Sequence, residues 1–134
     1  MPSEEVRRKA LVKLIDFLEV LDREVDVVLV EGSRDVDALQ RLGLRGRIEV
    51  CSRVGVPDSD LVESLARRVE TVVILTDFDI AGRQLNRRLT RLLELRGVKV
   101  ETSLRWTVGR LMAALRVYAV ESLDDAAEEL NPGL

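Results

Sequence analysis

Two aspartates one residue apart, Asp77 and Asp79, form the pair in this sequence whose spacing most clearly suggests chemistry. They follow an apolar, β-branched run at 72–75, which is typical of a buried strand, and they precede leucines at helical spacing. The pair therefore lies where a strand passes into a helix. Because neighbouring carboxylates repel each other at neutral pH, such a pair is stable when both are solvated or when a cation lies between them.

A third acid is expected at the same edge of a sheet. The run at 26–30 is predicted to be a strand that stops at Glu31-Gly32, where glycine would allow a sharp turn with positive φ. In a doubly wound sheet, ligands bind beyond the carboxyl ends of the strands, near the point where strand order reverses. If the two strands are neighbours, Glu31 lies beside Asp77 and Asp79, and Asp35 faces them from the next helix.

The types of these residues indicate which metal they could bind. Carboxylate oxygens without His or Cys suit Mg²⁺ or Mn²⁺ rather than zinc. The chain contains no histidine, which excludes Ser-His triads and most zinc and haem sites. The alternative is that these acids only cap helices and complement helix dipoles. The combination of Glu31-Gly32 with Asp77-x-Asp79, at the ends of two strands, favours the metal site.

Composition limits the remaining possibilities. A chain of 134 residues with 46% hydrophobic residues is expected to form one domain, residues 1–134. The net charge of −3 gives no overall attraction to a polyanion, so nucleic-acid binding would need a local basic patch or a bridging metal. One cysteine, Cys51, excludes an internal disulfide; it is expected in the core, and the protein in the cytoplasm. We expect neither a signal peptide nor a membrane span.

Apolar periodicity predicts helices that alternate with short strands. This alternation indicates βαβ units, a parallel sheet and helices on both of its faces. The helix that follows the second strand is expected to be capped by Asp58, and the last helix to begin with a capping box of Ser122 and Asp125. The predicted strands are 26–30, 47–51, 72–75 and 98–101; the predicted helices include 4–21, 79–96 and a tail at 107–130 whose first helix begins at Val108.

Two segments carry a family resemblance. The run from Glu31 to Leu39, followed by Gly43, resembles the first motif of the Toprim domain in its primase form, Glu-Gly-x-x-Asp-Val-x-Ala-Leu. The run from Thr76 to Gly82 resembles the second motif, Thr-Asp-Pro-Asp-x-x-Gly. Toprim domains are shared by primases, type IA and type II topoisomerases, OLD-type nucleases, a recombination mediator and a small ribosomal RNA maturase. The chain is most similar to compact stand-alone Toprim proteins of archaea.

The resemblance implies a fold and a set of roles. It implies a three-layer α/β/α domain with a four-stranded parallel, Rossmann-like sheet in the order 2-1-3-4, a core at about 26–101, and added N- and C-terminal helices. By resemblance, Glu31 is the general acid/base with Asp35 in support, and Asp77 and Asp79, together with Glu31, hold Mg²⁺, for which Mn²⁺ could substitute. Gly32 and Gly82 are expected to allow the turns and the close approach of a phosphate.

The sequence also departs from the family pattern. Type IA topoisomerases continue the second motif with further glutamates, where this chain has Ala81 and Arg83, so a second metal site is not expected. Tyr118 is the only tyrosine and is expected to pack rather than to act as a nucleophile. Strand passage and self-sufficient primer synthesis are not expected of so short a chain.

Arginines are predicted around the acidic edge. One follows each predicted strand, and as a group they are expected to contact phosphate: Arg34, Arg53, Arg83 and Arg105. Arg87, Arg88 and Arg91 are instead expected to form a solvated, salt-bridged helix face, with phosphate binding along this stripe as the alternative. Trp106 is expected in the core, with stacking on a nucleic-acid base as the alternative.

Two functional hypotheses follow. The first is Mg²⁺-dependent phosphoryl transfer on DNA or RNA, by a nuclease or an RNA-processing factor that cleaves phosphodiesters. The alternative is a non-catalytic nucleic-acid-binding or assembly module, acting with a protein partner that grips the substrate. A receiver-like phospho-acceptor domain would also end its strands in acids, but the Glu31-Gly32 motif argues against it.

Overall fold

The computed structural model describes residues 3–52 and 54–131. Helices alternate with strands through most of the chain, and the last part is helical. The elements in order are α1 (Glu4–Glu24), β1 (Val27–Val30), α2 (Ser33–Arg41), β2 (Ile48–Val50), α3 (Asp58–Arg68), β3 (Thr71–Ile74), α4 (Ile80–Leu95), β4 (Lys99–Val100), α5 (Thr102–Leu115), the 3₁₀ turn η1 (Val120–Ser122) and α6 (Leu123–Leu130).

The four strands form one parallel sheet in the order β2-β1-β3-β4, which confirms the predicted topology. The two central strands are β1 and β3, and Val28 of β1 is in register with Val73 of β3. Since parallel neighbours point the same way, the residues that follow β1 and β3 emerge at the same edge of the sheet. This topology is what brings the two acidic motifs together.

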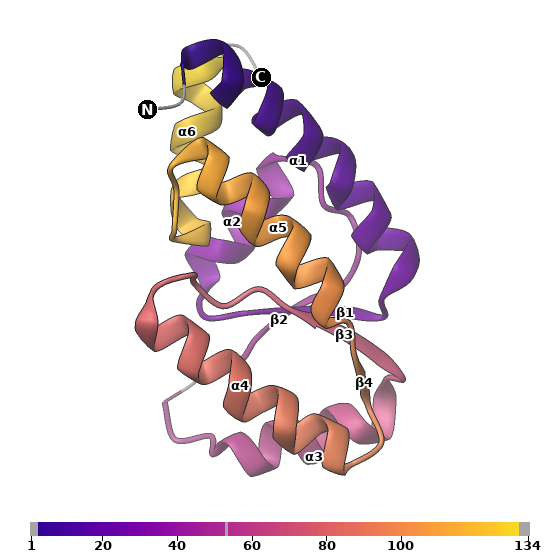
Figure 1. Ribbon diagram of the computed structural model, residues 1–134. Helices are drawn as coiled ribbons and strands as arrows, with labels where there is room; N and C mark the ends of the chain where they lie inside the picture. Colours follow the sequence, from indigo (N-terminus) through magenta and orange to yellow (C-terminus); the bar gives the residue numbers. More distant parts are fainter. Residues whose placement is uncertain (1–2, 53, 132–134) are drawn as a thin grey trace.

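Helices cover both faces of the sheet (Figure 1). Val28 and Val73 face the larger core, which is completed by α1, α2, α5, η1 and α6. Leu29 and Ile74 face the opposite way and pack against α3 and α4. Because both faces are buried, the strands are continuous apolar runs rather than alternating ones. Cys51, directly after β2, is buried in the second core as expected.

The first helix forms as predicted and runs three residues further, to Glu24. Ser3 caps it by accepting a hydrogen bond from the backbone N–H of Val6 at 3.2 Å, and Glu4 and Glu5 complement the helix dipole in the first turn. Its buried face packs against the larger core. Within the described residues, no helix is long and apolar enough to cross a membrane.

The C-terminal part differs most from expectation. α5 begins at Thr102 rather than at Val108, directly after a β4 of two residues. The sequence did not indicate a helix at the first turn of α5 because the residue buried in that turn is Arg105 and not an apolar residue. The run at 117–120, which the sequence left open between helix and extended chain, enters a 3₁₀ turn.

Two predicted helix caps were also wrong. Asp58 is the first residue of α3 and Pro57 is its N-cap, and the Asp58 carboxylate instead accepts a hydrogen bond from Arg88 of α4 at 2.6 Å. Ser122 is the N-cap of α6 but makes no capping side-chain bond, because the preceding turn η1 gives it helical rather than extended backbone angles.

Candidate functional site

A hydrogen bond joins the two acidic motifs. Oε2 of Glu31, just after β1, accepts from the backbone N–H of Asp77, just after β3, at 2.8 Å. The bond forms because β1 and β3 are adjacent and parallel. The structure thus brings Glu31 and Asp77 together, as the sequence predicted from the strand ends.

The surroundings of Glu31 raise the pKa of its carboxyl group. Its partial burial is the main cause that raises its pKa, and the negative charges of Asp77 and Asp35 raise it further. The hydrogen bond from the Asp77 N–H acts in the opposite direction. A raised pKa brings the proton affinity of this carboxyl group closer to neutral pH, which favours a role in proton transfer.

Asp35 lies at the same edge of the sheet and is buried. Its Oδ2 accepts from the backbone N–H of Gly32 at 2.9 Å, which closes the first turn of α2 against the end of β1. Burial raises the pKa of Asp35 first, and the charges of Asp77 and Glu121 add to the effect. The structure therefore places this side chain with the other acids, as expected.

The C-terminal segment takes part in the site, which the sequence did not predict. The backbone N–H of Val120 donates to Oδ1 of Asp77 at 3.0 Å, and the N–H of Phe78 donates to the carbonyl of Tyr118 at 2.9 Å. These bonds bring Glu121 near Asp35. No sequence motif marks Glu121, since its position depends on how η1 folds back onto the loop after β3.

Asp79 acts as the N-cap of α4. Its Oδ1 accepts from the backbone N–H of Gly82 at 2.7 Å, and the side chain is exposed. Capping satisfies a helix N–H that would otherwise have no partner. It engages one carboxylate oxygen of Asp79 and fixes where this aspartate lies relative to Asp77.

The two motif glycines have different roles. At Gly82 a Cβ would overlap the carbonyl oxygen of Asp77, so only glycine fits this close approach. The hydroxyl of Thr76 donates to the Gly82 carbonyl at 2.6 Å and further fastens the turn. The positive φ expected at Gly32 was wrong: its φ is −148°, an extended conformation open to any residue, because it is the N-cap of α2 and not a turn position.

Arg105 lies beneath the second motif, in a position that the sequence did not predict. Its guanidinium donates to the carbonyls of Ile74 at 3.0 Å, Thr76 at 2.8 Å and Asp77 at 3.2 Å, and it lies 4.2 Å from the centre of the Phe78 ring. Burial lowers the pKa of Arg105 to about 10, and the charge of Arg83 contributes. Arg105 lies in the first turn of α5 and not in a loop. From there its side chain reaches under the loop that follows β3 and fixes the backbone of that loop.

The other predicted phosphate contacts are divided between separate places. Arg83 lines the same hollow as Arg105, whereas Arg34 lines a different hollow beside Glu121. Arg53 lies outside the described residues. Phosphate binding by these arginines stays a prediction.

Further residues can be compared with expectation. Of the three arginines expected on a salt-bridged helix face, Arg88 pairs with Asp58, whereas Arg87 and Arg91 have no ion pair within the described residues. The expectation that Trp106 lies in the core was wrong, since Trp106 is 63% exposed; Tyr118, which was expected to pack, is 56% exposed. Both line the same hollow as Arg105.

The acidic residues fit a hard cation by their donor chemistry. Glu31, Asp77 and Asp79 each use one carboxylate oxygen in a hydrogen bond to a backbone N–H. The second oxygens have no hydrogen-bond partner in the described part of the chain, and oxygen is the donor that Mg²⁺ prefers. Among residues 3–52 and 54–131, however, no three His, Cys, Asp or Glu side chains are grouped closely enough to hold a metal by themselves.

Several known proteins are similar to this chain. The UPF0292 protein MJ1624 of Methanocaldococcus jannaschii is 36% identical over 69% of this chain and 73% of that protein. The UPF0292 protein PF1724 of Pyrococcus furiosus is 36% identical over 89% of this chain and 87% of that protein. A solved structure from Aquifex aeolicus has a TM-score of 0.66 at 26% identity, over 83% of this chain and 95% of that one.

The match to a domain family covers the sheet and both acidic motifs. Residues 26–102 match the Toprim domain, which is more than half of the chain and runs from β1 into the start of α5. Together with the archaeal relatives, this match confirms the resemblance that the two motifs suggested. The chain belongs to the Toprim domain family, and within it to the small UPF0292 proteins of archaea.

Proposed function

We propose that this protein carries out Mg²⁺-dependent phosphoryl transfer on nucleic acid, most simply the cleavage of a phosphodiester. The observation that carries the proposal is the hydrogen bond between Glu31 and Asp77, because it gathers acids from two strands at one edge of the sheet. When bound, Mg²⁺ supplies positive charge that neutralises the charge developing on a transferred phosphoryl group. Asp77, Asp79 and Glu31 are the proposed ligands, with water and phosphate oxygens completing the shell.

In this proposal Glu31 is the general acid/base. Its raised pKa, caused first by burial, brings its proton affinity closer to neutral pH. Asp35 is a supporting residue, because it holds the N–H of Gly32 and so fixes the chain directly after Glu31. Arg83 and Arg34 are proposed to contact phosphates, whereas the hydrogen bonds of Arg105 favour a positioning role.

The proposal is tested by cleavage assays with labelled single-stranded and duplex DNA and RNA. We expect cleavage that requires Mg²⁺ or Mn²⁺, stops with EDTA, and falls at least a hundredfold in Glu31→Gln and Asp77→Asn. Glu63→Gln is the matched control, since Glu63 is an exposed acid of α3 whose one ion pair within the described residues is with Arg67. No cleavage of any substrate, or equal cleavage by Glu31→Gln, would refute the proposal.

A second candidate is a binding or assembly module that acts with a protein partner. It is favoured by the finding that no three acids in the described residues are grouped for a metal, and by the contacts that already engage Asp77 and Asp79. Calorimetric titration with Mg²⁺, combined with the cleavage assay, separates the two candidates. Nucleic-acid binding that persists without measurable Mg²⁺ binding or turnover would favour the module.

A further inference from the structure

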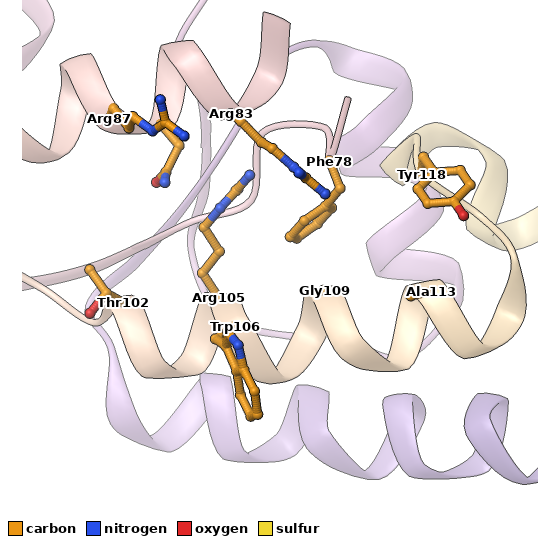
Figure 2. A pocket seen from close by; sticks show the side chains of 10 residues that line it. Phe78, Arg83, Arg87, Thr102, Arg105, Trp106, Gly109, Ala113 and Tyr118 are labelled. Carbon is orange, nitrogen blue, oxygen red and sulfur yellow. The ribbon is translucent and has the colours of Figure 1, made fainter. Parts of the chain in front are cut away.

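A hollow of about 420 Å³ opens between α4 and α5, next to the second acidic motif (Figure 2). This volume falls in the range of small-molecule sites. Phe78, which lies between Asp77 and Asp79 in the sequence, forms part of its wall, so an occupant would lie directly beside the acids. The hollow is outside the acidic cluster itself, and apart from Phe78 and Arg83 it is built from residues outside the second motif and its continuation in type IA topoisomerases.

Three of the four aromatic residues of the chain gather at this hollow. The sequence has only two Phe, one Trp and one Tyr, and Phe78, Trp106 and Tyr118 all line it. The fourth, Phe17 on α1, packs against the larger core. Trp106 and Tyr118 are largely exposed, and although the Arg110 guanidinium lies 4.9 Å from the centre of the Trp106 ring, the other face of this ring and the Tyr118 ring are available to a ligand. Aromatic rings that are rare elsewhere are therefore concentrated where they can be contacted.

The same hollow is positively charged. Among the described residues that line it are three arginines and no acid, although the chain as a whole has 24 acids and a net charge of −3. Arg83 and Arg87 have no ion pair or hydrogen bond to an acid within the described residues, whereas Arg88 beside them pairs with Asp58. In Figure 2 the side chains of Arg83 and Arg105 extend toward the Phe78 ring from α4 and α5. The charge of the lining is complementary to an anion.

A second hollow extends the first along α4. It has a volume of about 620 Å³ and shares Asn86, Arg87 and Thr102 with the first, so the two form one groove. Arg91 lines the extension, together with one acid, Glu94. Arg83, Arg87 and Arg91 are each four residues apart, which places them on one face of the helix at intervals of roughly 6 Å. A row of cations along a groove suits a chain of anions better than a single one.

We infer that this groove binds unpaired nucleotides of a single-stranded nucleic acid and leads the strand past the acidic motifs. The phosphates lie along Arg83, Arg87 and Arg91, and bases stack on the exposed aromatic rings at the end nearest Asp77. Cationic grooves with stacking platforms are how proteins bind single strands without sequence preference. The inference rests on the proposed function for its choice of ligand, since it names the form of nucleic acid that the site takes.

A duplex fits these features less well. In a duplex the base faces are already stacked on each other, so Trp106 and Tyr118 would have no base to contact. A free mononucleotide could occupy the first hollow but would leave the extension at Arg91 without a ligand. The occupant that uses both the aromatic rings and the whole row of arginines is an unpaired strand.

Binding can be measured without catalysis. Trp106 is the only tryptophan, so its fluorescence reports on this groove directly. In EDTA, titration with a 12-residue oligothymidylate should quench the fluorescence, while a 12-base-pair duplex and thymidine monophosphate should bind at least tenfold more weakly. Equal binding of the duplex or of the mononucleotide would overturn the inference. The oligoribonucleotide equivalent would show which sugar is preferred.

Variants connect the binding to the groove. With a fluorescein-labelled 12-mer and anisotropy, Trp106→Ala should weaken binding roughly five- to a hundredfold, and Trp106→Phe should restore most of it. Arg87→Gln should reduce the slope of log affinity against log salt by about 0.7. Arg88→Gln is the matched control and should leave the slope unchanged, because Arg88 pairs with Asp58. Unchanged binding in Trp106→Ala and Arg87→Gln would refute the inference.

The result is distinct from that of the cleavage test. If cleavage requires a metal and Glu31, but nucleic-acid binding does not depend on Trp106 or Arg87, the proposed function stands and the inference about the groove is refuted. If single-strand binding depends on Trp106 and Arg87 but no cleavage occurs, the inference about the groove is supported and the proposed phosphoryl transfer is refuted.

Discussion

The carboxylate of Glu31 accepts a hydrogen bond from the backbone N–H of Asp77 at 2.8 Å, and this bond links the ends of the two central strands. The residues are 46 positions apart in the chain. The bond fixes the second motif relative to the first, and it also places a partly buried carboxylate beside two other acids. It therefore connects the stability of the domain with the chemistry proposed for it.

The first prediction concerns pH. Because the pKa of Glu31 is raised above its ordinary value of 4.5, the folded protein keeps this proton to a higher pH than the unfolded chain does. The free energy of unfolding that Glu31 contributes is thus fully present below pH 4.5 and is lost as pH rises through the raised pKa. Glu31→Gln keeps an oxygen acceptor for the Asp77 N–H but removes the titration.

In EDTA, the variant should therefore gain stability relative to the wild type as pH rises. Urea unfolding at intervals between pH 4 and pH 8 measures the difference. Glu63→Gln, on the exposed face of α3, serves as control and should run parallel to the wild type. A constant difference between Glu31→Gln and the wild type over this range would contradict the prediction.

The second prediction contrasts the two motif glycines. Gly82→Ala should destabilise the protein by about 3 kcal/mol or more and distort the second motif, because its Cβ would overlap the Asp77 carbonyl. Gly32→Ala should cost about 1 kcal/mol or less, since its φ of −148° suits alanine and nothing lies within 4 Å of a Cβ there. Denaturant midpoints of the two variants provide the test, and equal losses would show that the turn at Gly82 can relax.

The third prediction concerns Arg105. Arg105→Met should destabilise the protein by about 2–5 kcal/mol, because the carbonyls of Ile74, Thr76 and Asp77 lose their buried donor. Arg105→Lys should restore only part of this loss, since an ammonium does not reproduce the planar fork of the guanidinium. Arg110→Met, in the same helix but exposed, is the control. A loss no larger than that of the control would contradict a positioning role.

The fourth prediction uses the contact between Asp77 and Val120. If Asp77 holds Mg²⁺, the metal changes the electron density on the carboxylate that accepts from the Val120 N–H. The amide resonance of Val120 should shift during Mg²⁺ titration, and the shift should vanish in Asp77→Ala. The amide of Gly97, at the far end of α4, should stay unchanged. An unmoved Val120 resonance at saturating Mg²⁺ would argue against Asp77 as a ligand.

Much of the fold could be predicted from the sequence because its causes are local. The β-branched runs of β1 and β3 indicate buried strands, and Ser3 and Gly97 mark the beginning of α1 and the end of α4. Alternation of strands with helices then restricts the topology, since parallel crossovers are right-handed. The approach of Glu31 to Asp77 requires β1 and β3 to be neighbours, which the resemblance to the Toprim domain implied and the sheet order confirms.

The sequence by itself therefore determined the element order, the family and the acids at one edge of the sheet. Tertiary structure alone decided which carboxylate oxygens are engaged, that Arg105 is buried under the second motif, and that η1 folds back to bring Val120 to Asp77. It also gathered Trp106 and Tyr118 beside the arginines of α4. The physical reason is that these contacts join residues far apart in the chain through the packing of α5 and η1, and no local propensity or spacing encodes such packing.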